Sequence, residues 1–173
     1  MSRQFFIADT HFGHKNIIEY ENRPFETTEK MDSRIIENWN KTVKQKDRIY
    51  ILGDFALSNK KRIVELIKSL NGYKIFVLGN HDKCYSYAWW NTAGFDMVCA
   101  YPIIIDEWFI LSHEPLYTNS NMPYVNIFGH VHGNPEYNDF SKQHFCVSCE
   151  RIDYTPIEMK EIVKKINSLN RKG

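Results

Sequence analysis

The sequence predicts an α/β fold in which two sheets pack face to face and helices cover the outside. Three apolar runs in the first half alternate with two amphipathic segments, an order that implies parallel strands joined by right-handed crossovers. In the second half the apolar runs follow one another directly, and one amphipathic segment closes the chain. Residue types that bind metals follow most of these predicted strands, so we expect one edge of the sheets to carry the function.

Length and composition place bounds on the kind of protein. A chain of 173 residues without repeats or linkers fits one domain, so we assign residues 1–173 to a single domain. The net charge of +1 provides no bulk attraction for nucleic acid or an anionic membrane. No apolar run approaches the roughly 18 residues of a membrane span, and the N-terminus lacks the pattern of a signal peptide. We therefore expect a cytoplasmic protein with no membrane partner.

The first half is expected to contain three strands and three helices. Apolar residues four apart (Met31, Ile35, Trp39, Val43) mark the buried stripe of its longest helix. The strands are expected at residues 4–8, 48–52 and 73–77, and the helices at 28–44, 60–70 and, as a short helix, 85–92. Residues 19–26 form an irregular polar connection.

The second half is expected to form four strands and a terminal helix. The strands cover residues 98–105, 108–111, 125–128 and 145–148; the first two pair around a turn at Asp106-Glu107, and residues 118–123 form a polar loop. Thr155-Pro156-Ile157-Glu158 has the pattern of a capping box with proline at the first helical position. It predicts a helix from that point, with Met159, Ile162, Val163, Ile166 and Leu169 on one face.

The four cysteines are expected to be reduced thiols. Cys146 and Cys149 form a C-x-x-C pair, but a spacing of three within a strand places the sulfurs on opposite faces. No second C-x-x-C completes a zinc site, so core or edge thiols are favoured over ligands.

Eight side chains that could bind metal or substrate lie just past the ends of predicted strands. They are Asp9, His11, Asp54, Asn80, His81, His113, His130 and His132. Because ligands bind at the carboxyl ends of strands in open α/β sheets, we expect them to gather at one rim. Imidazole and carboxylate groups suit zinc, iron or manganese. The set is too large for one tetrahedral ion and suits two ions that share a bridging carboxylate.

The spacing of these residues supports that interpretation. Asp9 and His11 are two apart, so both point to one side of an extended segment, and His130 and His132 repeat the pattern. A glycine directly precedes Asp54, Asn80 and His130, where the absence of a side chain lets the backbone turn tightly beside an ion.

These residues carry a resemblance to a known family. The blocks Asp9-x-His11, Gly53-Asp54, Gly79-Asn80-His81-Asp82, His113 and Gly129-His130-x-His132, in that order, resemble the calcineurin-like metallophosphoesterase superfamily. The resemblance implies a four-layer α/β/β/α sandwich with a dinuclear centre. One metal would be held by Asp9, His11 and His132 and the other by Asn80, His113 and His130, with Asp54 bridging. His81 would protonate or stabilise the leaving oxygen. Manganese is favoured, with iron, zinc and nickel as alternatives.

The resemblance predicts a metal-dependent phosphoesterase in which two cations clamp the phosphate and activate a bridging water. The Asp54 block reads Gly53-Asp54-Phe55-Ala56-Leu57-Ser58 and lacks the acidic residue and arginine of the protein phosphatase branch. We therefore favour a phosphodiesterase acting on a small phosphorylated or nucleotide substrate. A small-molecule phosphomonoesterase and a non-catalytic metal-bearing interaction module are the alternatives. Nucleic acid is not indicated by the charge, and a homodimer is an option because relatives often form one.

For several residues near these blocks, the sequence leaves two interpretations open. Arg23 and His14 are candidates to contact substrate, with a surface arginine and an ordinary polar turn as the alternatives, and Asn80 is a further candidate in addition to its role as a ligand. Asp82 either caps the following helix, which we favour, or orients the His81 turn. The aromatic run that includes Tyr85, Tyr87, Trp89 and Trp90 either packs a helix, which we favour, or stacks a base. Glu114 stands where many relatives have glycine, so the backbone after His113 is expected to differ.

Overall fold

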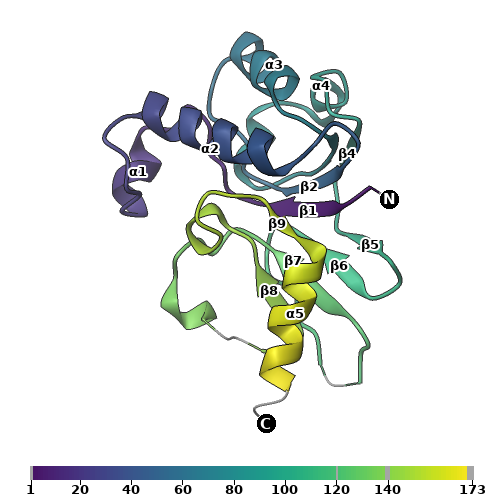
Figure 1. Cartoon of the computed structure of the whole chain (residues 1–173). Helices are drawn as coiled ribbons and strands as arrows, with labels where there is room; N and C mark the ends of the chain where they lie inside the picture. The colour runs from purple at the N-terminus through teal and green to yellow at the C-terminus, as the bar shows by residue number, and fades with distance from the viewer. Residues whose placement is uncertain (1, 120, 139–140, 171–173) are drawn as a thin grey trace.

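The computed structural model describes residues 2–119, 121–138 and 141–170, and it has the expected four layers. Two sheets are stacked between helices (Figure 1): a five-stranded sheet with order β4-β3-β2-β1-β9 and a four-stranded sheet with order β5-β6-β7-β8. The strands are β1 (Gln4–Ile7), β2 (Arg48–Leu52), β3 (Tyr73–Val77), β4 (Met97–Cys99), β5 (Ile103–Ile105), β6 (Phe109–Leu111), β7 (Val125–Phe128), β8 (His144–Cys146) and β9 (Ile157–Glu158).

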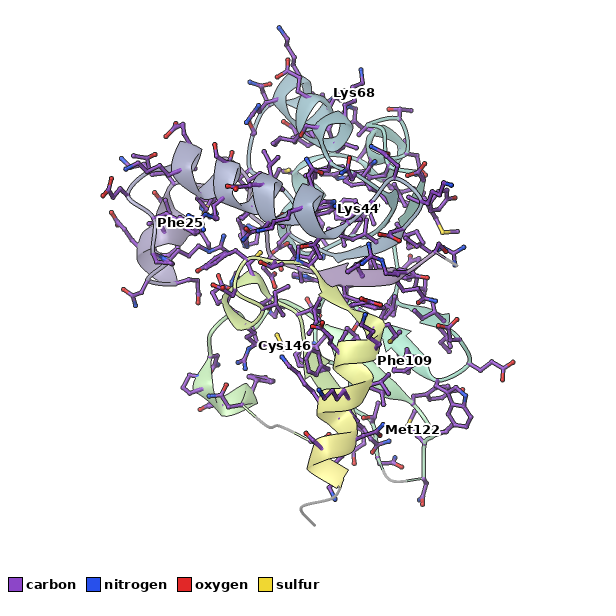
Figure 2. All side chains as sticks on the ribbon, viewed as in Figure 1. Phe25, Lys44, Lys68, Phe109, Met122 and Cys146 are labelled. Carbon is purple, nitrogen blue, oxygen red and sulfur yellow. The ribbon has the colours of Figure 1, made fainter. Side chains whose placement is uncertain are left out.

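Helices cover the outer face of each sheet. Helices from the first half of the chain lie over the five-stranded sheet, and the terminal helix lies along β7 and β8 (Figure 1). The α-helices are α1 (Asn16–Tyr20), α2 (Thr28–Thr42), α3 (Lys60–Ser69), α4 (Tyr87–Trp90) and α5 (Met159–Asn170), and short 3-10 turns include His81–Cys84 and Cys149–Arg151. The expected α2 stripe is confirmed, because all four of its apolar residues are buried. Side chains fill the layers between helices and sheets (Figure 2).

The strands β1, β2 and β3 are parallel, as the alternating pattern predicts, and β4 extends the same parallel sheet. Their carboxyl ends therefore lie at one edge. At that edge β1 also meets the second sheet, because Ala8 N–H donates to the Val147 carbonyl (2.9 Å) and Cys149 N–H donates to the Ala8 carbonyl (3.1 Å). The ends of β6, β7 and β8 are thereby brought against those of the first sheet.

The single strand predicted at residues 98–105 is wrong. It is two strands in different sheets: β4 pairs with β3, and β5 pairs with β6. Residues 100–102 cross between the sheets and end in Pro102, whose nitrogen has no hydrogen to donate to a ladder. The hairpin turn that follows is confirmed, since Asp106 and Glu107 both adopt positive φ (47° and 61°) and the Trp108 N–H donates to the Ile105 carbonyl (3.2 Å).

The capping box predicted at residues 155–158 is also wrong. Ile157 and Glu158 form β9, antiparallel to β1, and α5 begins only at Met159. The Thr155 hydroxyl donates to the Asp153 carbonyl (2.9 Å) and so does not cap the helix. Ile162 and Ile166 are buried as expected, whereas the side chain of Leu169 lies outside the described residues. Helix α1 was not predicted, and it overlaps the segment expected to be irregular.

All four cysteines are free thiols. Cys146 ends β8, and Cys149 lies beyond the strand in a 3-10 turn, fully buried. Among the described residues, no cysteine joins a group that could hold a metal. In the same part of the chain no helix combines the length and the apolar character needed to cross a membrane.

Candidate metal centre

The eight side chains predicted to form the site come from five loops that meet at the shared edge of the two sheets. Asp9 and His11 follow β1, Asp54 follows β2, and Asn80 and His81 follow β3. His113 follows β6, and His130 and His132 follow β7. The structure brings all of these loops together, as the contacts below show.

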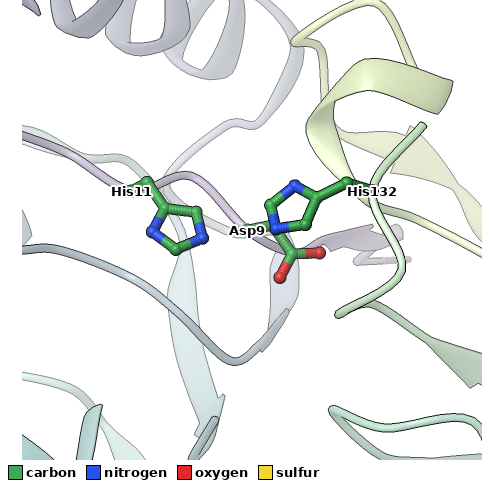
Figure 3. A group of neighbouring side chains, drawn as sticks. All are labelled: Asp9, His11 and His132. Carbon is green, nitrogen blue, oxygen red and sulfur yellow. The ribbon is translucent and has the colours of Figure 1, made fainter. Parts of the chain in front are cut away.

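The first group consists of Asp9, His11 and His132. One ligand atom of each lies within 4.8 Å of those of the other two. Figure 3 shows the three side chains converging from two loops, those after β1 and β7, and the rings of His11 and His132 are stacked with centroids 5.2 Å apart. Asp9 Oδ1 and His11 Nε2 are buried without a hydrogen-bond partner. Burying a polar atom without a partner costs free energy, so Asp9 Oδ1 and His11 Nε2 are suited to act as ligands of a bound cation.

The second group consists of Asn80, His113 and His130. Asn80 Oδ1 lies 2.8 Å from His113 Nε2 and 3.2 Å from His130 Nδ1, and the two ring nitrogens are 3.2 Å apart. One amide oxygen and two imidazole nitrogens therefore form a compact triangle. Such N/O donors suit a borderline divalent metal.

Asp54 lies between the two groups. Its Oδ2 is 3.6 Å from His11 Nε2 in the first group and 3.5 Å from His113 Nε2 in the second. Its Oδ1 accepts the His81 backbone N–H at 2.9 Å, which holds the carboxylate in place. A carboxylate in this position can bridge two ions.

The ligand side chains are oriented by hydrogen bonds to those of their atoms that do not face the metal site. His113 Nδ1 donates to the Leu52 carbonyl (2.9 Å) and His132 Nδ1 donates to the Glu150 carboxylate (3.2 Å), so each ring keeps its Nε2 lone pair for a ligand. Asp9 Oδ2 accepts from the Ser148 hydroxyl (2.6 Å) and the His130 backbone N–H (2.8 Å). Its Oδ1 is thereby left to face the site.

Burial shifts the pKa values of His11 and Asp9 in opposite directions. Burial lowers the pKa of His11 far below the usual histidine value, and the nearby His132 and Arg23 lower it further, so the ring is neutral. Burial raises the pKa of Asp9 to about 6, although His132 opposes this. A buried carboxylate with a raised pKa gains from a neighbouring cation, which would lower its pKa again.

The backbone at the ligands is unusual. Five of the seven predicted ligands adopt positive φ, between 46° and 69°: Asp9, His11, Asp54, His130 and His132. Residues other than glycine rarely adopt this conformation, and such strain clusters at functional sites.

The glycines that precede ligands are required because neighbouring atoms lie too close to leave room for a side chain. A Cβ on Gly79 would lie 2.4 Å from Asp54 Oδ1, and one on Gly129 would lie 2.7 Å from Asp9 Oδ2.

Two further histidines border the ligands. The His81 side chain is 48% exposed, and its Nε2 lies 4.0 Å from Asp54 Oδ2. His14 is half-buried, and its Nδ1 lies 3.3 Å from His11 Nδ1. Both rings are near His11, with centroids 5.4 Å (His81) and 5.3 Å (His14) from it. His81 is thus placed on the open side of the centre.

Arg23 does not have the expected position. It is buried, and its guanidinium donates to the carbonyls of Asp9 (2.7 Å) and Thr10 (3.1 Å) and to Glu150 (2.7 Å), so it is neither a surface residue nor available to a substrate. It fixes the backbone of the loop after β1, because the N–H groups of a planar guanidinium match the geometry of carbonyl and carboxylate acceptors.

The favoured cap role of Asp82 is wrong. Its carboxylate is buried and accepts backbone N–H groups of Asp54 (2.8 Å), Phe55 (3.1 Å) and Gly79 (2.7 Å). It therefore ties the loop after β2 to the loop after β3, while Ser86 caps α4. The aromatic run packs as favoured at Trp90, which is fully buried against Phe76.

Ser148 and Glu150 also support the site but were not predicted to do so. Both follow β8, beyond the last signature block: the Ser148 hydroxyl donates to Asp9, and the Glu150 carboxylate accepts from His132 and Arg23. Their one signal in the sequence is that polar residues interrupt an apolar run after a strand, the pattern used for the other five loops.

Comparison with known proteins agrees with this geometry. Residues 3–145 match the family of calcineurin-like phosphoesterases. An uncharacterized protein of Methanocaldococcus jannaschii is 35% identical over 96% of this chain and 92% of its own length. The crystal structure of a protein of unknown function from Aquifex aeolicus is similar with a TM-score of 0.77 and 29% identity, covering 95% of this chain and 99% of that one. This chain belongs to the calcineurin-like phosphoesterase family, which consists generally of metal-dependent phosphoesterases.

Proposed function

We propose that the protein is a phosphodiesterase with a dinuclear metal centre. The main support for this proposal is the position of Asp54 Oδ2 between the two groups of metal ligands. It lies 3.6 Å from His11 Nε2 in one group and 3.5 Å from His113 Nε2 in the other. One ion would be held by Asp9, His11 and His132, the other by Asn80, His113 and His130, and Asp54 would bridge them. Two divalent ions bound there supply Lewis-acid polarisation of the phosphoryl group and acidify a water nucleophile.

His81 acts on the leaving group in this proposal. It belongs to neither donor group, yet its backbone is held by Asp54 and its half-exposed ring stands at the centre. An imidazole in that position can give a proton to the departing oxygen, a role that contributes about 10²–10⁴-fold in rate. His14 lies beside it and is a candidate to contact the phosphate from the same side.

The preference for a diester follows from the charges around the ligands. A monoester dianion carries one more negative charge than a diester, and an arginine fork is the usual partner for it. Arg23, which lies beside the first donor group, is fully engaged by carbonyls and Glu150 and faces away. We therefore place manganese-supported diester hydrolysis ahead of monoester hydrolysis.

The direct test combines elemental analysis with two chromogenic substrates. Purified protein loaded with Mn²⁺ should contain about two ions per chain and cleave bis(p-nitrophenyl) phosphate faster than p-nitrophenyl phosphate. Faster cleavage of the monoester would identify a phosphomonoesterase. Bound metal with neither activity would identify an interaction module.

Two variants separate the proposed roles. His81→Ala should lower kcat by about 100-fold or more with metal content unchanged. Asp54→Asn should lose metal as well as activity, because it removes the shared ligand. Lys15→Ala, an exposed residue in the loop after His14, serves as a control and should leave both readouts unchanged. Loss of both ions in His81→Ala would refute the role given to that residue.

A further inference from the structure

A groove of about 530 Å³ opens directly beside the second donor group. Asn80 and His113 form part of its lining, so the groove and the metal centre share two side chains. One wall comes from the segment after β3, including Tyr85 and Tyr87, and another from the link between β4 and β5, including Tyr101. An ester whose phosphorus lies at the metal centre would extend one substituent into this space.

The walls present mainly apolar surface, and the hydroxyl groups of Tyr85, Tyr87 and Ser112 are already engaged. The Tyr85 hydroxyl donates to the Ser58 carbonyl (2.9 Å), that of Tyr87 to the Val98 carbonyl (3.2 Å), and that of Ser112 to the Glu114 carbonyl (2.6 Å). Tyr87 is therefore anchored through its hydroxyl while the residue remains 48% exposed. Tyr101 is 80% exposed. Exposed aromatic rings around an apolar groove suit a flat ring system.

Two charged residues, Glu114 and Lys83, complete the lining. Neither forms an ion pair within the described part of the chain, and Glu114 directly follows the ligand His113. The Glu114 carboxylate can accept N–H or O–H groups and the Lys83 ammonium can donate, and their opposite charges leave this part of the lining without net charge. The groove thus matches a neutral substituent that is flat, apolar on its faces and polar at its edge.

A nucleobase has these properties. We propose that this groove binds the base of a nucleotide-type phosphodiester, with Tyr101 and Tyr87 contacting its face and Glu114 and Lys83 its polar edge. The proposal rests on the proposed function and specifies its substrate class. It also gives a role to Tyr87 in the aromatic run, whereas Trp90 of the same run packs in the core.

The test compares two diesters with the same leaving group. The p-nitrophenyl ester of thymidine 5′-phosphate and methyl p-nitrophenyl phosphate release the same chromophore and differ in the substituent that would occupy the groove. The nucleoside ester should have the higher kcat/KM, by roughly 5- to 100-fold, the range expected for stacking of one base. Octyl p-nitrophenyl phosphate tests an aliphatic occupant, and its preference over the nucleoside ester would overturn the proposal.

Variants locate the effect. Tyr101→Ala should remove most of the advantage of the nucleoside ester and leave the methyl ester unchanged, while Tyr101→Trp should retain it. Tyr117→Ala is the matched control, since Tyr117 is similarly exposed (86%) but does not line the groove. Equal kcat/KM for both esters, or equal effects of the Tyr101 and Tyr117 variants, would overturn the groove assignment while phosphodiesterase activity stands.

A binding measurement keeps the two proposals separable. Titration of the Mn²⁺-loaded protein with thymidine 5′-phosphate and with inorganic phosphate should show tighter binding of the nucleotide, by a factor that Tyr101→Ala lowers. If neither ester is cleaved but this pattern holds, the proposed function fails and the groove assignment stands. Equal affinity for nucleotide and phosphate would overturn the groove assignment.

Discussion

Asp82 shows how one residue outside the metal ligands can hold the site together. Its two oxygens accept three backbone N–H groups from the loops that carry Asp54 and Asn80. Burial raises the pKa of this carboxyl to about 6, and the nearby Asp54 adds to the shift, while the hydrogen bonds oppose it. The residue therefore occupies an electrostatically costly position that the geometry of the two loops requires.

Removing this carboxylate should affect both stability and metal binding. Asp82→Ala leaves three buried donors unpaired, and each such group costs about 1–3 kcal/mol, so we expect a loss of about 3 kcal/mol or more in the free energy of unfolding. Urea denaturation measures this. Asp96→Ala is the control, because its exposed carboxylate accepts the Lys74 N–H and lies outside the site. An equal, small loss in both variants would contradict the role assigned to Asp82.

Asp32 allows a prediction about pH away from the metal ligands. It is buried on α2 and accepts the Gly13 N–H at 3.1 Å. Burial raises its pKa from 3.8 to about 6, so the folded state holds this proton more tightly than the unfolded chain. As the pH rises from about 4 to 6, the wild type therefore loses stability relative to a variant that cannot ionise.

Asp32→Asn keeps the acceptor for Gly13 and removes the charge. Its stability relative to the wild type should rise between about pH 4 and 6, by on the order of 1–3 kcal/mol, and stay level above that range. Urea unfolding at a series of pH values checks this. Asp47→Asn should show no such rise, because burial raises the pKa of Asp47 but the hydrogen bonds from Arg3 and Lys44 together outweigh it, so the pKa is lowered. A flat difference for Asp32→Asn would show that the residue titrates normally.

At the scale of elements, α2 forms for reasons that are local and testable. Its apolar stripe is buried, and the Thr27 hydroxyl accepts the Lys30 N–H at its start. Thr27→Ala should cost about 1 kcal/mol of stability, the usual value of an N-cap, and leave metal content unchanged. Thr28→Ala, one residue further along and without a cap bond, is the control for thermal unfolding. Equal effects of the two changes would contradict the capping role.

The elements also show which parts of the fold the sequence could predict. Helices α2 and α3 and strands β1 to β3 were predictable because their periodicity is local and their neighbours follow in order. The break between β4 and β5 was not, because residues 97–105 read as one apolar segment whichever sheet each part joins. Strand β9 was not predictable because it has two residues and depends on pairing with the edge of β1. That pairing outweighed the local capping pattern at residues 155–158.

The same distinction applies to the site. Ligand candidates such as Asp9, Asp54 and His130 were predictable because each follows a strand, and strand ends share an edge. Arg23, Ser148 and Glu150 depend on contacts such as Arg23–Glu150 and Ser148–Asp9, which join segments more than 100 residues apart, so no local pattern predicts their roles. Their positions follow only from the meeting of β1 with the end of β8.

At the scale of the whole molecule, the proposed metal centre joins the two sheets. Asp9, His11, Asp54 and Asn80 come from the ends of the five-stranded sheet, and His113, His130 and His132 from the four-stranded sheet. Each donor group contains residues from both sheets. The direct contacts across this edge include the His130 backbone N–H donated to Asp9 Oδ2. Ions bound here would therefore act as a clamp between the layers.

Metal removal should consequently loosen the whole molecule rather than one loop. Binding to the folded state alone stabilises by about 2.7 kcal/mol at a hundredfold excess over Kd, which for a chain of this size raises Tm by roughly 5–10 °C. Thermal unfolding with Mn²⁺ and with EDTA measures this, and hydrogen exchange should slow at the His130 amide when metal is present. His81→Ala should keep the Mn²⁺-dependent rise in Tm and Asp54→Asn should lose it, because only Asp54 belongs to the proposed ligand set. A rise retained by Asp54→Asn would mean that the ions bind elsewhere, and the clamp between the sheets would have to be abandoned.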